Sequence, residues 1–222
     1  MSVEDNKRLA AEAAVQEVRD GMVVGLGTGS TAAFAIAALS HRCAAGLRIE
    51  AVATSEASTA AASASGIIVR DFADFATLDL AIDGADEIDS RLWAVKGAGG
   101  AMLREKAVAA AARRFIVIAD GSKLVQAIGA AKLPVEVLPF ARAFAVAQLE
   151  NLGAAVTIRP SYCTDNGNLV ADCRFNAMTD PPALAAAIAA IPGALGHGLF
   201  LDEVDAAYIA ADGVTTRLGR PA

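Results

Sequence analysis

The sequence contains few of the residues that build disulfide frameworks and zinc centres. Its 222 residues include three cysteines and two histidines. Cys43, Cys163 and Cys173 lie far apart and form no C-x-x-C pair, so neither a disulfide scaffold nor a thiolate metal site is expected. His41 and His197 are too few for a histidine-rich zinc site. We expect idle or buried thiols in a reducing compartment.

Long apolar runs and an excess of positive charge are also missing. No segment approaches the roughly 20 uninterrupted apolar residues of a membrane-spanning helix, because Pro192 and three glycines interrupt the most apolar stretch, residues 183–200. The first ten residues lack the hydrophobic region of a signal peptide. The net charge of −6 disfavours a general nucleic-acid surface. We therefore expect a cytoplasmic protein that binds small molecules, and neither membranes nor nucleic acids.

The first part of the chain has the pattern of an α/β protein. The composition is 55% hydrophobic and 20% charged, which is typical of globular domains. Short apolar strands alternate with helical segments of about ten to fifteen residues, and this alternation predicts a Rossmann-like, doubly wound parallel sheet. The predicted strands are residues 22–25, 48–53, 67–70, 78–82 and 115–119, and the predicted helices are 4–19, a segment ending near 39, 56–65 and 101–114.

The pattern changes after Lys132. Predicted strands at 133–138, 154–159, 168–174 and 194–200 and helices at 140–152 and 181–190 follow in the order βαββαβ, which is the ferredoxin-like split motif. An Asn-Gly turn at 164–167 joins the middle strands. A hairpin of residues 206–210 and 214–217 is expected to rejoin the first domain. We predict a catalytic domain of residues 1–131 plus 205–222, and a smaller α+β domain of residues 132–204.

A glycine-rich loop, Gly25-Leu26-Gly27-Thr28-Gly29-Ser30-Thr31, separates a predicted strand from a predicted helix. The loop N–H groups and the helix N-terminus would form an anion-binding site. The dinucleotide fingerprint G-x-G-x-x-G is met only in part, because Ser30 replaces the third glycine and no acidic residue ends the next strand. The P-loop motif is absent. A site for one phosphate needs only the donors present, and it is favoured over a dinucleotide site or a merely structural turn.

Two aspartates, Asp83 and Asp86, lie in a glycine-containing turn that follows the apolar run at residues 78–82. Ligands of open α/β sheets bind beyond such strand ends. Lys96 follows a second short apolar run, and carboxylates beside an ammonium group favour acid–base chemistry. Two alternatives remain, because aspartates also stabilise turns and paired carboxylates bind Mg²⁺. Lys96 disfavours the metal if it shares the cleft.

Glu105 lies near the start of the predicted helix 101–114. An acidic residue there either stabilises the helix dipole or acts as a general base, and its position does not separate these roles. Gly97, Gly99 and Gly100 permit close approach of a ligand, and the following helix N-terminus would stabilise negative charge on an oxygen. A phosphate site, a carboxylate base and a lysine-bearing loop suit proton abstraction next to a carbonyl of a phosphorylated small molecule.

Together these motifs resemble those of ribose-5-phosphate isomerase, type A. Several motifs in the same order and spacing are more specific than any one of them, and they extend over nearly the full chain. The matching segments are residues 25–31, 83–87, 96–99, 103–106, 118–123, 133–137 and 164–168.

The resemblance implies an aldose–ketose isomerase that interconverts ribose 5-phosphate and ribulose 5-phosphate in the pentose phosphate pathway. It implies a homo-oligomer, commonly a dimer, without a metal or other cofactor. Glu105 would be the base of an enediolate mechanism, and Asp83, Asp86 and Lys96 would bind and protonate the substrate oxygens. The implied substrate contacts are Lys7, Thr28, Gly29, Ser30, Thr31, Gly84, Ala85, Gly97, Ala98, Gly99 and Lys123.

One position departs from the family pattern. Ala98 stands where the family often has a third consecutive glycine, and its methyl group is tolerated if its φ is negative. Two other functions are weighed against the isomerase. A sugar-phosphate sensor is disfavoured by the presence of both Lys96 and Glu105, and a nicotinamide enzyme would require tight NAD binding.

Overall fold

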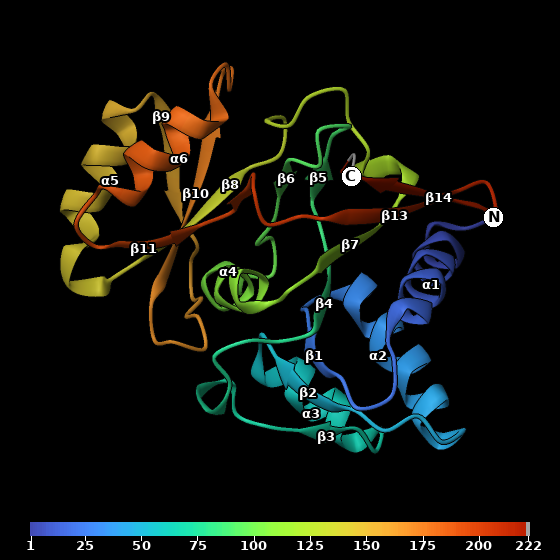
Figure 1. Ribbon diagram of the computed structural model, residues 1–222. Coiled ribbons are helices and arrows are strands. Elements are labelled where there is room, and N and C mark those ends of the chain that lie inside the picture. Colours follow the sequence, from blue (N-terminus) through green and yellow to red (C-terminus); the bar gives the residue numbers. More distant parts are fainter. Residues whose placement is uncertain (221–222) are drawn as a thin grey trace.

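A seven-stranded sheet forms the centre of the larger part of the molecule in a computed structural model that describes residues 1–220 (Figure 1). Its strand order is β14-β13-β7-β4-β1-β2-β3, with only β14 antiparallel to its neighbour. The predicted Rossmann-like fold is confirmed. The strands are β1 (Val23–Leu26), β2 (Glu50–Ala53), β3 (Ile68–Val69), β4 (Leu80–Gly84), β7 (Phe115–Asp120), β13 (Ala206–Ala211) and β14 (Val214–Gly219).

Helices cover both faces of this sheet. Alternate residues of a strand point to opposite faces, and the apolar side chains on each face are buried beneath helices. In β4, Leu80 and Ile82 pack in the same cluster as α1 and α2, whereas Ala81 packs with Val108 and Ala109 on the other face. These two apolar clusters form the main core. The helices are α1 (Val3–Ala14), α2 (Ser30–Ala44), α3 (Glu56–Ala64) and α4 (Met102–Ala111).

The direction of chain progression across the sheet reverses between β1 and β4. From β1 the chain continues outward through β2 and β3, and from β4 it continues the other way through β7 and β13. Loops at such a reversal diverge to opposite faces and leave a crevice at the carboxyl ends of the strands. The loop after β1 and the Asp83-Gly84 end of β4 both lie at this crevice.

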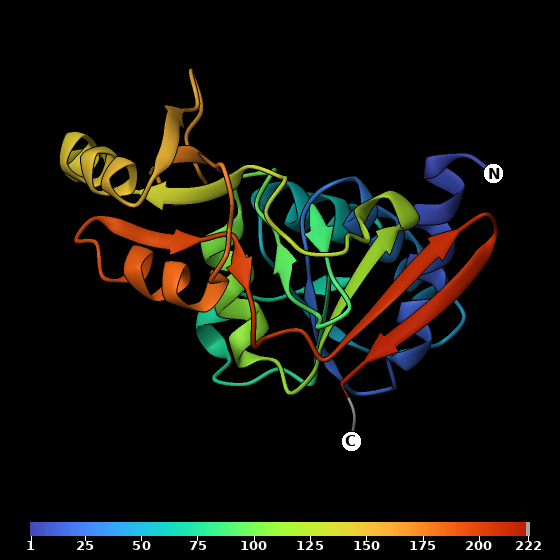
Figure 2. The same ribbon diagram turned by 90° about the horizontal axis from the view of Figure 1, so that it is seen from above.

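A four-stranded antiparallel sheet forms the smaller part (Figure 2). Its order, β11-β8-β10-β9, is that of the predicted ferredoxin-like motif. Leu133, Val135 and Val137 of β8 pack beneath its two helices, so Pro134 and Glu136 lie on the other face. The elements are β8 (Leu133–Val137), α5 (Arg142–Asn151), β9 (Ala154–Ile158), β10 (Leu169–Phe175), α6 (Pro181–Ala189) and β11 (Ala194–His197).

The prediction of one strand over residues 194–200 is wrong. The chain forms β11 and then β12 (Leu199–Phe200), which belongs to a third sheet with β6 (Ala94–Val95) and β5 (Glu87–Ile88). The break occurs at Gly198, whose N–H donates to the Pro134 carbonyl and whose carbonyl accepts from the Lys96 N–H, both at 2.8 Å. A Cβ at this glycine would lie 2.1 Å from the Lys96 carbonyl oxygen. Glycine therefore allows the backbones of residues 198 and 96 to pack closely at the point where the chain leaves one sheet and joins the other.

Other predicted boundaries need smaller corrections. The first helix ends at Ala14 and continues as a 3₁₀ turn, Val15–Glu17, whereas α2 extends to Ala44 rather than to about residue 39. The Asn-Gly turn is present, but it is the tip of a long loop at residues 159–168 rather than a tight hairpin. Three further 3₁₀ turns are Phe72–Asp74, Gly121–Lys123 and Pro139–Ala141. The closing hairpin rejoins the large sheet through β13, as predicted.

Candidate active site

One cleft at the β1–β4 crevice gathers the residues that the sequence predicted for the site, with a volume of about 200 Å³. Asp83 is buried directly beside it, behind the loop that follows β1. The residues that line the cleft are Lys7, Thr28, Gly29, Ser30, Thr31, Gly84, Ala85, Asp86, Lys96, Gly97, Ala98, Gly99, Glu105 and Lys123.

The β1–α2 loop (residues 27–29) is held by Asp83. One carboxylate oxygen of Asp83 accepts the N–H groups of Thr28 at 3.0 Å and of Gly84 at 2.7 Å. Gly27 allows this approach, because a Cβ there would lie 1.9 Å from the same oxygen. Gly29 then adopts a φ of 97° as the N-cap of α2. The loop therefore delivers a helix N-terminus to the cleft, where it can bind an anion.

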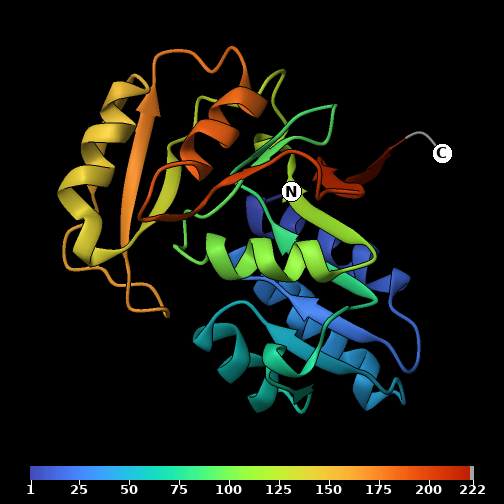
Figure 3. The same cartoon turned by 60° about the vertical axis from the view of Figure 1, so that its left-hand side comes forward.

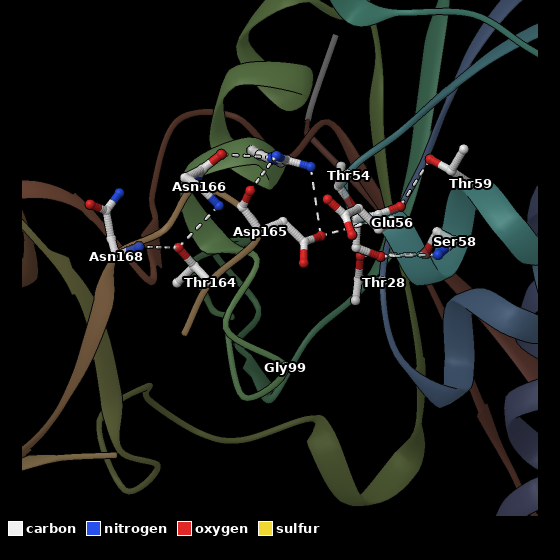
Figure 4. Close-up of polar contacts among 12 residues, drawn as sticks. Thr28, Thr54, Glu56, Ser58, Thr59, Gly99, Thr164, Asp165, Asn166 and Asn168 are labelled. Atoms are coloured by element: carbon white, nitrogen blue, oxygen red, sulfur yellow. Dashed lines mark hydrogen bonds and ion pairs between the residues drawn. The ribbon is translucent and has the colours of Figure 1, made fainter. Parts of the chain in front are cut away.

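Two side chains of the predicted phosphate site differ in their direction. The Thr28 hydroxyl lies 2.8 Å from the Thr54 hydroxyl and 3.4 Å from that of Ser58, on the side of α3 (Figure 4). The Ser30 hydroxyl instead accepts a 3.0 Å hydrogen bond from Lys7 Nζ. Ser30 and Lys7 thus place a hydroxyl and an ammonium group at the α2 N-terminus. The Thr28 side chain instead connects the β1–α2 loop to Thr54 and to Ser58 of α3.

A buried charge cluster forms the other end of the cleft. Lys96 Nζ lies 2.8 Å from Asp83 Oδ2 and 3.3 Å from Glu105 Oε2, and the three side chains are 2–4% exposed. The ammonium group also donates to the Gly84 carbonyl. Its other surroundings are apolar, with the Phe200 ring centroid 5.4 Å from Nζ. Poor hydration strengthens every charge interaction in this cluster.

Burial and neighbouring charges shift the protonation of this cluster. Burial, and next the Asp83 carboxylate, raise the pKa of Glu105 to about 8, against the opposing effect of Lys96. Burial acts most strongly on Lys96 and lowers its pKa, but the carboxylates of Asp83 and Glu105 outweigh burial and the net shift is upward. Lys96 is therefore an ammonium group, and Glu105 can bind or release a proton near neutral pH.

Asp86 also lines the cleft and is hydrogen-bonded to the glycine loop (residues 97–100). The Ala98 N–H donates to Asp86 Oδ2 at 2.9 Å. Burial raises the pKa of Asp86, while this N–H and the ammonium groups of Lys96 and Lys123 oppose the rise. A carboxyl group of raised pKa at this position can transfer protons with an oxygen of a ligand.

The glycine loop accommodates its alanine. Gly97 and Gly100 have positive φ values of 99° and 81°, but Ala98 is not among the residues with positive φ and its side chain is exposed. The methyl group of Ala98 is therefore tolerated, as expected for a residue whose φ is not positive. Gly100 is followed by α4, whose first turn carries Glu105.

Two residues at this loop were missed by the sequence predictions. Arg159 and Tyr162 come from the smaller sheet's β9–β10 loop (residues 159–168), and both donate hydrogen bonds to carbonyl groups of the glycine loop. They lie more than 60 residues away in the chain, and no local pattern connects them to the cleft.

Metal-ligating side chains do not cluster in the described residues: over 1–220, no three His, Cys, Asp or Glu side chains are arranged to hold a metal ion. Within the same range, none of the helices combines the length and apolar character needed to cross a membrane.

Comparisons with known proteins agree with the motif pattern. Residues 50–213 match the family described as Ribose 5-phosphate isomerase A (phosphoriboisomerase A). Ribose-5-phosphate isomerase A of Sphingopyxis alaskensis is 53% identical over 208 residues, covering 92% of this chain and 91% of that protein. The crystal structure of ribose 5 phosphate isomerase A from Neisseria gonorrhoeae is 34% identical and has a TM-score of 0.95, with 100% and 99% of the two chains covered.

The archaeal structure of ribose 5-phosphate isomerase A from Methanocaldococcus jannaschii is 36% identical, with a TM-score of 0.94 and coverage of 99% and 100%. These matches extend over both sheets. The chain belongs to the ribose 5-phosphate isomerase A family of enzymes, as its motifs predicted.

Proposed function

We propose that this protein interconverts D-ribose 5-phosphate and D-ribulose 5-phosphate, with Glu105 as the base, in the non-oxidative branch of the pentose phosphate pathway. One observation carries this proposal. A buried Lys96 lies between two carboxylates, within the same cleft as a helix N-terminus flanked by lysines. An aldose–ketose isomerase of a sugar phosphate needs these two ends: one for proton transfer and one for the phosphate.

The anchoring end binds the phosphate. The N-terminus of α2 presents backbone N–H groups and a partial positive charge to the cleft, and Lys7 and Lys123 line the same cleft. The anchored phosphate places the sugar carbons toward Lys96 and Glu105. Binding energy from this unreactive group is then used to orient the reacting carbons.

Glu105 moves the carbon-bound proton. In the direction from aldose to ketose, its carboxylate removes the proton from C2, and the C2–H electron pair forms the C1=C2 double bond of an enediolate. The carbonyl electrons move to O1. Return of the proton to C1 then completes the ketose once the O2 proton has moved to O1. A pKa of about 8 suits this role, because the carboxyl group must accept and release a proton near physiological pH.

Lys96, Asp83 and Asp86 act on the oxygens. The Lys96 ammonium group stabilises negative charge that develops on O1 or O2, and the low hydration of the cluster increases this effect. Asp83 fixes Lys96 through the 2.8 Å ion pair. Asp86, which lines the cleft, carries protons between the two oxygens.

The test is isomerisation of ribose 5-phosphate in D₂O. We expect ribulose 5-phosphate with deuterium at C1, because a proton held on Glu105 exchanges with solvent. Glu105→Gln should lower kcat by roughly 10² to 10⁴-fold with little change in KM. Absence of ketose from the native protein would refute the function, and near-normal kcat in the variant would refute the base. Activity should persist after chelation of metals.

Three coarser expectations accompany this function. We propose the division into residues 1–131 plus 205–222 and residues 132–204, supported by an apolar cluster drawn mostly from the smaller part. We also propose a homo-oligomer, commonly a dimer in this family, and a cytoplasmic location. Light scattering of the purified protein tests the subunit number, and limited proteolysis tests the domain division.

A further inference from the structure

The glycine loop is held from the side of the smaller domain by hydrogen bonds to three successive carbonyl groups. Arg159 donates from Nη2 to the Gly97 carbonyl at 3.2 Å and from Nη1 to the Ala98 carbonyl at 2.9 Å. The Tyr162 hydroxyl donates to the Gly99 carbonyl at 2.7 Å. None of these donors lies in the main sheet or its helices, so the smaller domain constrains the loop that lines the active-site cleft.

These contacts also set the direction of the loop N–H groups. In a trans peptide the carbonyl and the next residue's N–H point in opposite directions. Holding the Gly97 carbonyl therefore aims the Ala98 N–H away from Arg159, toward Asp86, to which it donates at 2.9 Å. Holding the Ala98 carbonyl likewise aims the N–H of Gly99, which lines the cleft, away from the guanidinium group.

The guanidinium group is itself fixed. Asp172 accepts from Arg159 Nη2 at 2.7 Å and from Nε at 3.0 Å, a two-point pair in which the side chains are 17% and 10% exposed. Asp172 lies on β10, opposite Pro134 of β8, on the sheet face that carries no helices. The Arg159 guanidinium carbon lies 5.5 Å from the Tyr162 ring centroid. Arg159, at the start of the β9–β10 loop, thus presents its N–H groups in a planar fork that Asp172 fixes, which a lysine cannot reproduce.

We propose that Arg159, oriented by Asp172 and assisted by Tyr162, is a positioning residue for the isomerisation. It holds the glycine loop so that the Ala98 N–H orients Asp86 and the Gly99 N–H faces the oxygens of the reacting sugar. This inference rests on the proposed function and extends it to the smaller domain, which thereby sets the geometry of the reacting end.

Contacts that do not involve Arg159 also join the two domains. At the tip of the same loop, Asp165 Oδ2 accepts the Glu56 N–H at the start of α3 at 2.8 Å (Figure 4). Arg104 of α4 donates to the Asn166 side chain at 2.7 Å and to the Asp165 carbonyl at 2.9 Å. Figure 3 shows α4 between the two sheets. Removal of the Arg159 side chain should therefore leave the domains docked, and its effect on rate can be separated from unfolding.

The experiment compares Arg159→Met, Arg159→Lys and Asp172→Asn with Arg174→Met, a control at an exposed arginine on the same sheet. We expect Arg159→Met to lower kcat on the order of 10- to 100-fold, less than the loss of a direct oxyanion donor, with KM changed by less than about 3-fold because the phosphate anchor is intact. Arg159→Lys should recover part of kcat. Asp172→Asn should cause a smaller loss, and Arg174→Met none.

Hydrogen exchange of the Ala98 and Gly99 amides provides a readout that does not require turnover. We expect the Ala98 amide to exchange faster in Arg159→Met than in the native protein, with an unchanged melting temperature. Native kcat together with native exchange in Arg159→Met would overturn the inference while leaving the isomerase function intact. If the native protein produced no ketose, the proposed function would fail, and the amide exchange would still decide whether Arg159 fixes the loop.

Discussion

The two ends of the cleft use positive charge in different ways. At the reacting end, Lys96 is 2% exposed and lies against two buried carboxylates and a phenylalanine ring. At the end proposed to bind the phosphate, Lys7 is partly exposed beside the N-terminus of α2 and donates to the exposed Ser30. Lys123 lines the same cleft and is also partly exposed. Lys96 is part of a buried charge cluster, whereas Lys7 and Lys123 keep some contact with solvent.

This difference matches what each end would do in the proposed isomerisation. Stabilising a short-lived enediolate requires a charge that is preorganised and poorly screened by water. Holding a permanent phosphate dianion requires attraction that still allows release, and hydrated lysines with backbone N–H groups are suited to that. The same residue type therefore has a large electrostatic effect at one end and a moderate effect at the other.

Lys96→Met is expected to produce the largest effect. The substitution removes the ammonium group that pairs with the buried carboxyl groups of Asp83 and Glu105. Its loss should lower the free energy of unfolding by about 3–5 kcal/mol. It should also reduce kcat by at least 10²-fold, because the enediolate loses its nearest cation. Urea unfolding and steady-state kinetics measure both. A variant with native stability would show that the cluster does not depend on Lys96.

The pH dependence of Glu105 should be the next largest effect. Its pKa in the folded protein, about 8, lies above its ordinary value of 4.5. Stability linked to this group is complete below pH 4.5 and is lost as pH rises through 8, so Glu105→Gln should gain stability relative to the native protein over that range. One pKa unit corresponds to about 1.4 kcal/mol, so the difference should amount to several kcal/mol. Denaturation of both proteins at pH 5 and pH 9 measures it.

The activity of the native protein should change in the same pH range. Only the carboxylate form of Glu105 accepts a proton, so kcat/KM should rise with pH and level off above about 8. Rates measured from pH 5 to 10 test this. A profile that is flat from pH 6 to 9 would contradict a base with this pKa.

Lys123→Met should have a smaller effect of another kind. Because Lys123 is a partly exposed cation of the cleft and is proposed to contact the phosphate, its loss should raise KM by about 10-fold, or roughly 1.4 kcal/mol, and leave kcat and stability nearly unchanged. Added salt should weaken substrate binding less in the variant than in the native protein. A fall in kcat as large as that of Lys96→Met would remove the distinction between the two ends.

Ala98→Gly should produce the smallest effect. The Ala98 side chain is exposed and its φ is not positive, so restoring the glycine relieves no strain. We expect kcat and KM within about 2-fold of native values and a slight loss of stability, since glycine increases the entropy of the unfolded chain. A large gain in kcat would show that the methyl group distorts the glycine loop.

Local patterns were sufficient to predict much of the architecture. Strand periodicity, glycine-marked strand ends and the βαββαβ order identified the doubly wound sheet and the smaller antiparallel sheet. The predictions were wrong where close packing interrupts a pattern: residues 194–200 have the composition of one strand, but Gly198 passes beside Lys96 and divides them between two sheets. The two-residue strand β5 was not predicted, because it is too short to show a period.

The site residues also separate into features that local patterns predict and features that only packing decides. Asp83, Asp86, Lys96 and Glu105 were predicted for the site from the chain alone, because each follows an apolar run or a glycine turn. The structure brings them together at one cleft, although Lys96 follows β6, which belongs to the antiparallel third sheet. The chain could not distinguish Glu105 as a base from Glu105 as a helix-dipole partner. That choice depends on burial and on the 3.3 Å approach to Lys96, which exist only after the sheet, α4 and β12 have packed together.

The role inferred for Arg159 depends wholly on tertiary structure. Its partners, Asp172, Gly97 and Ala98, lie on separate segments, and no spacing in the sequence connects them. Backbone propensity and hydrophobic periodicity act over a few residues, so they determined the elements and the chemical groups at their ends. Distances, burial and hydrogen-bond directions arise from packing between distant segments, so only the fold decided which groups act on one another.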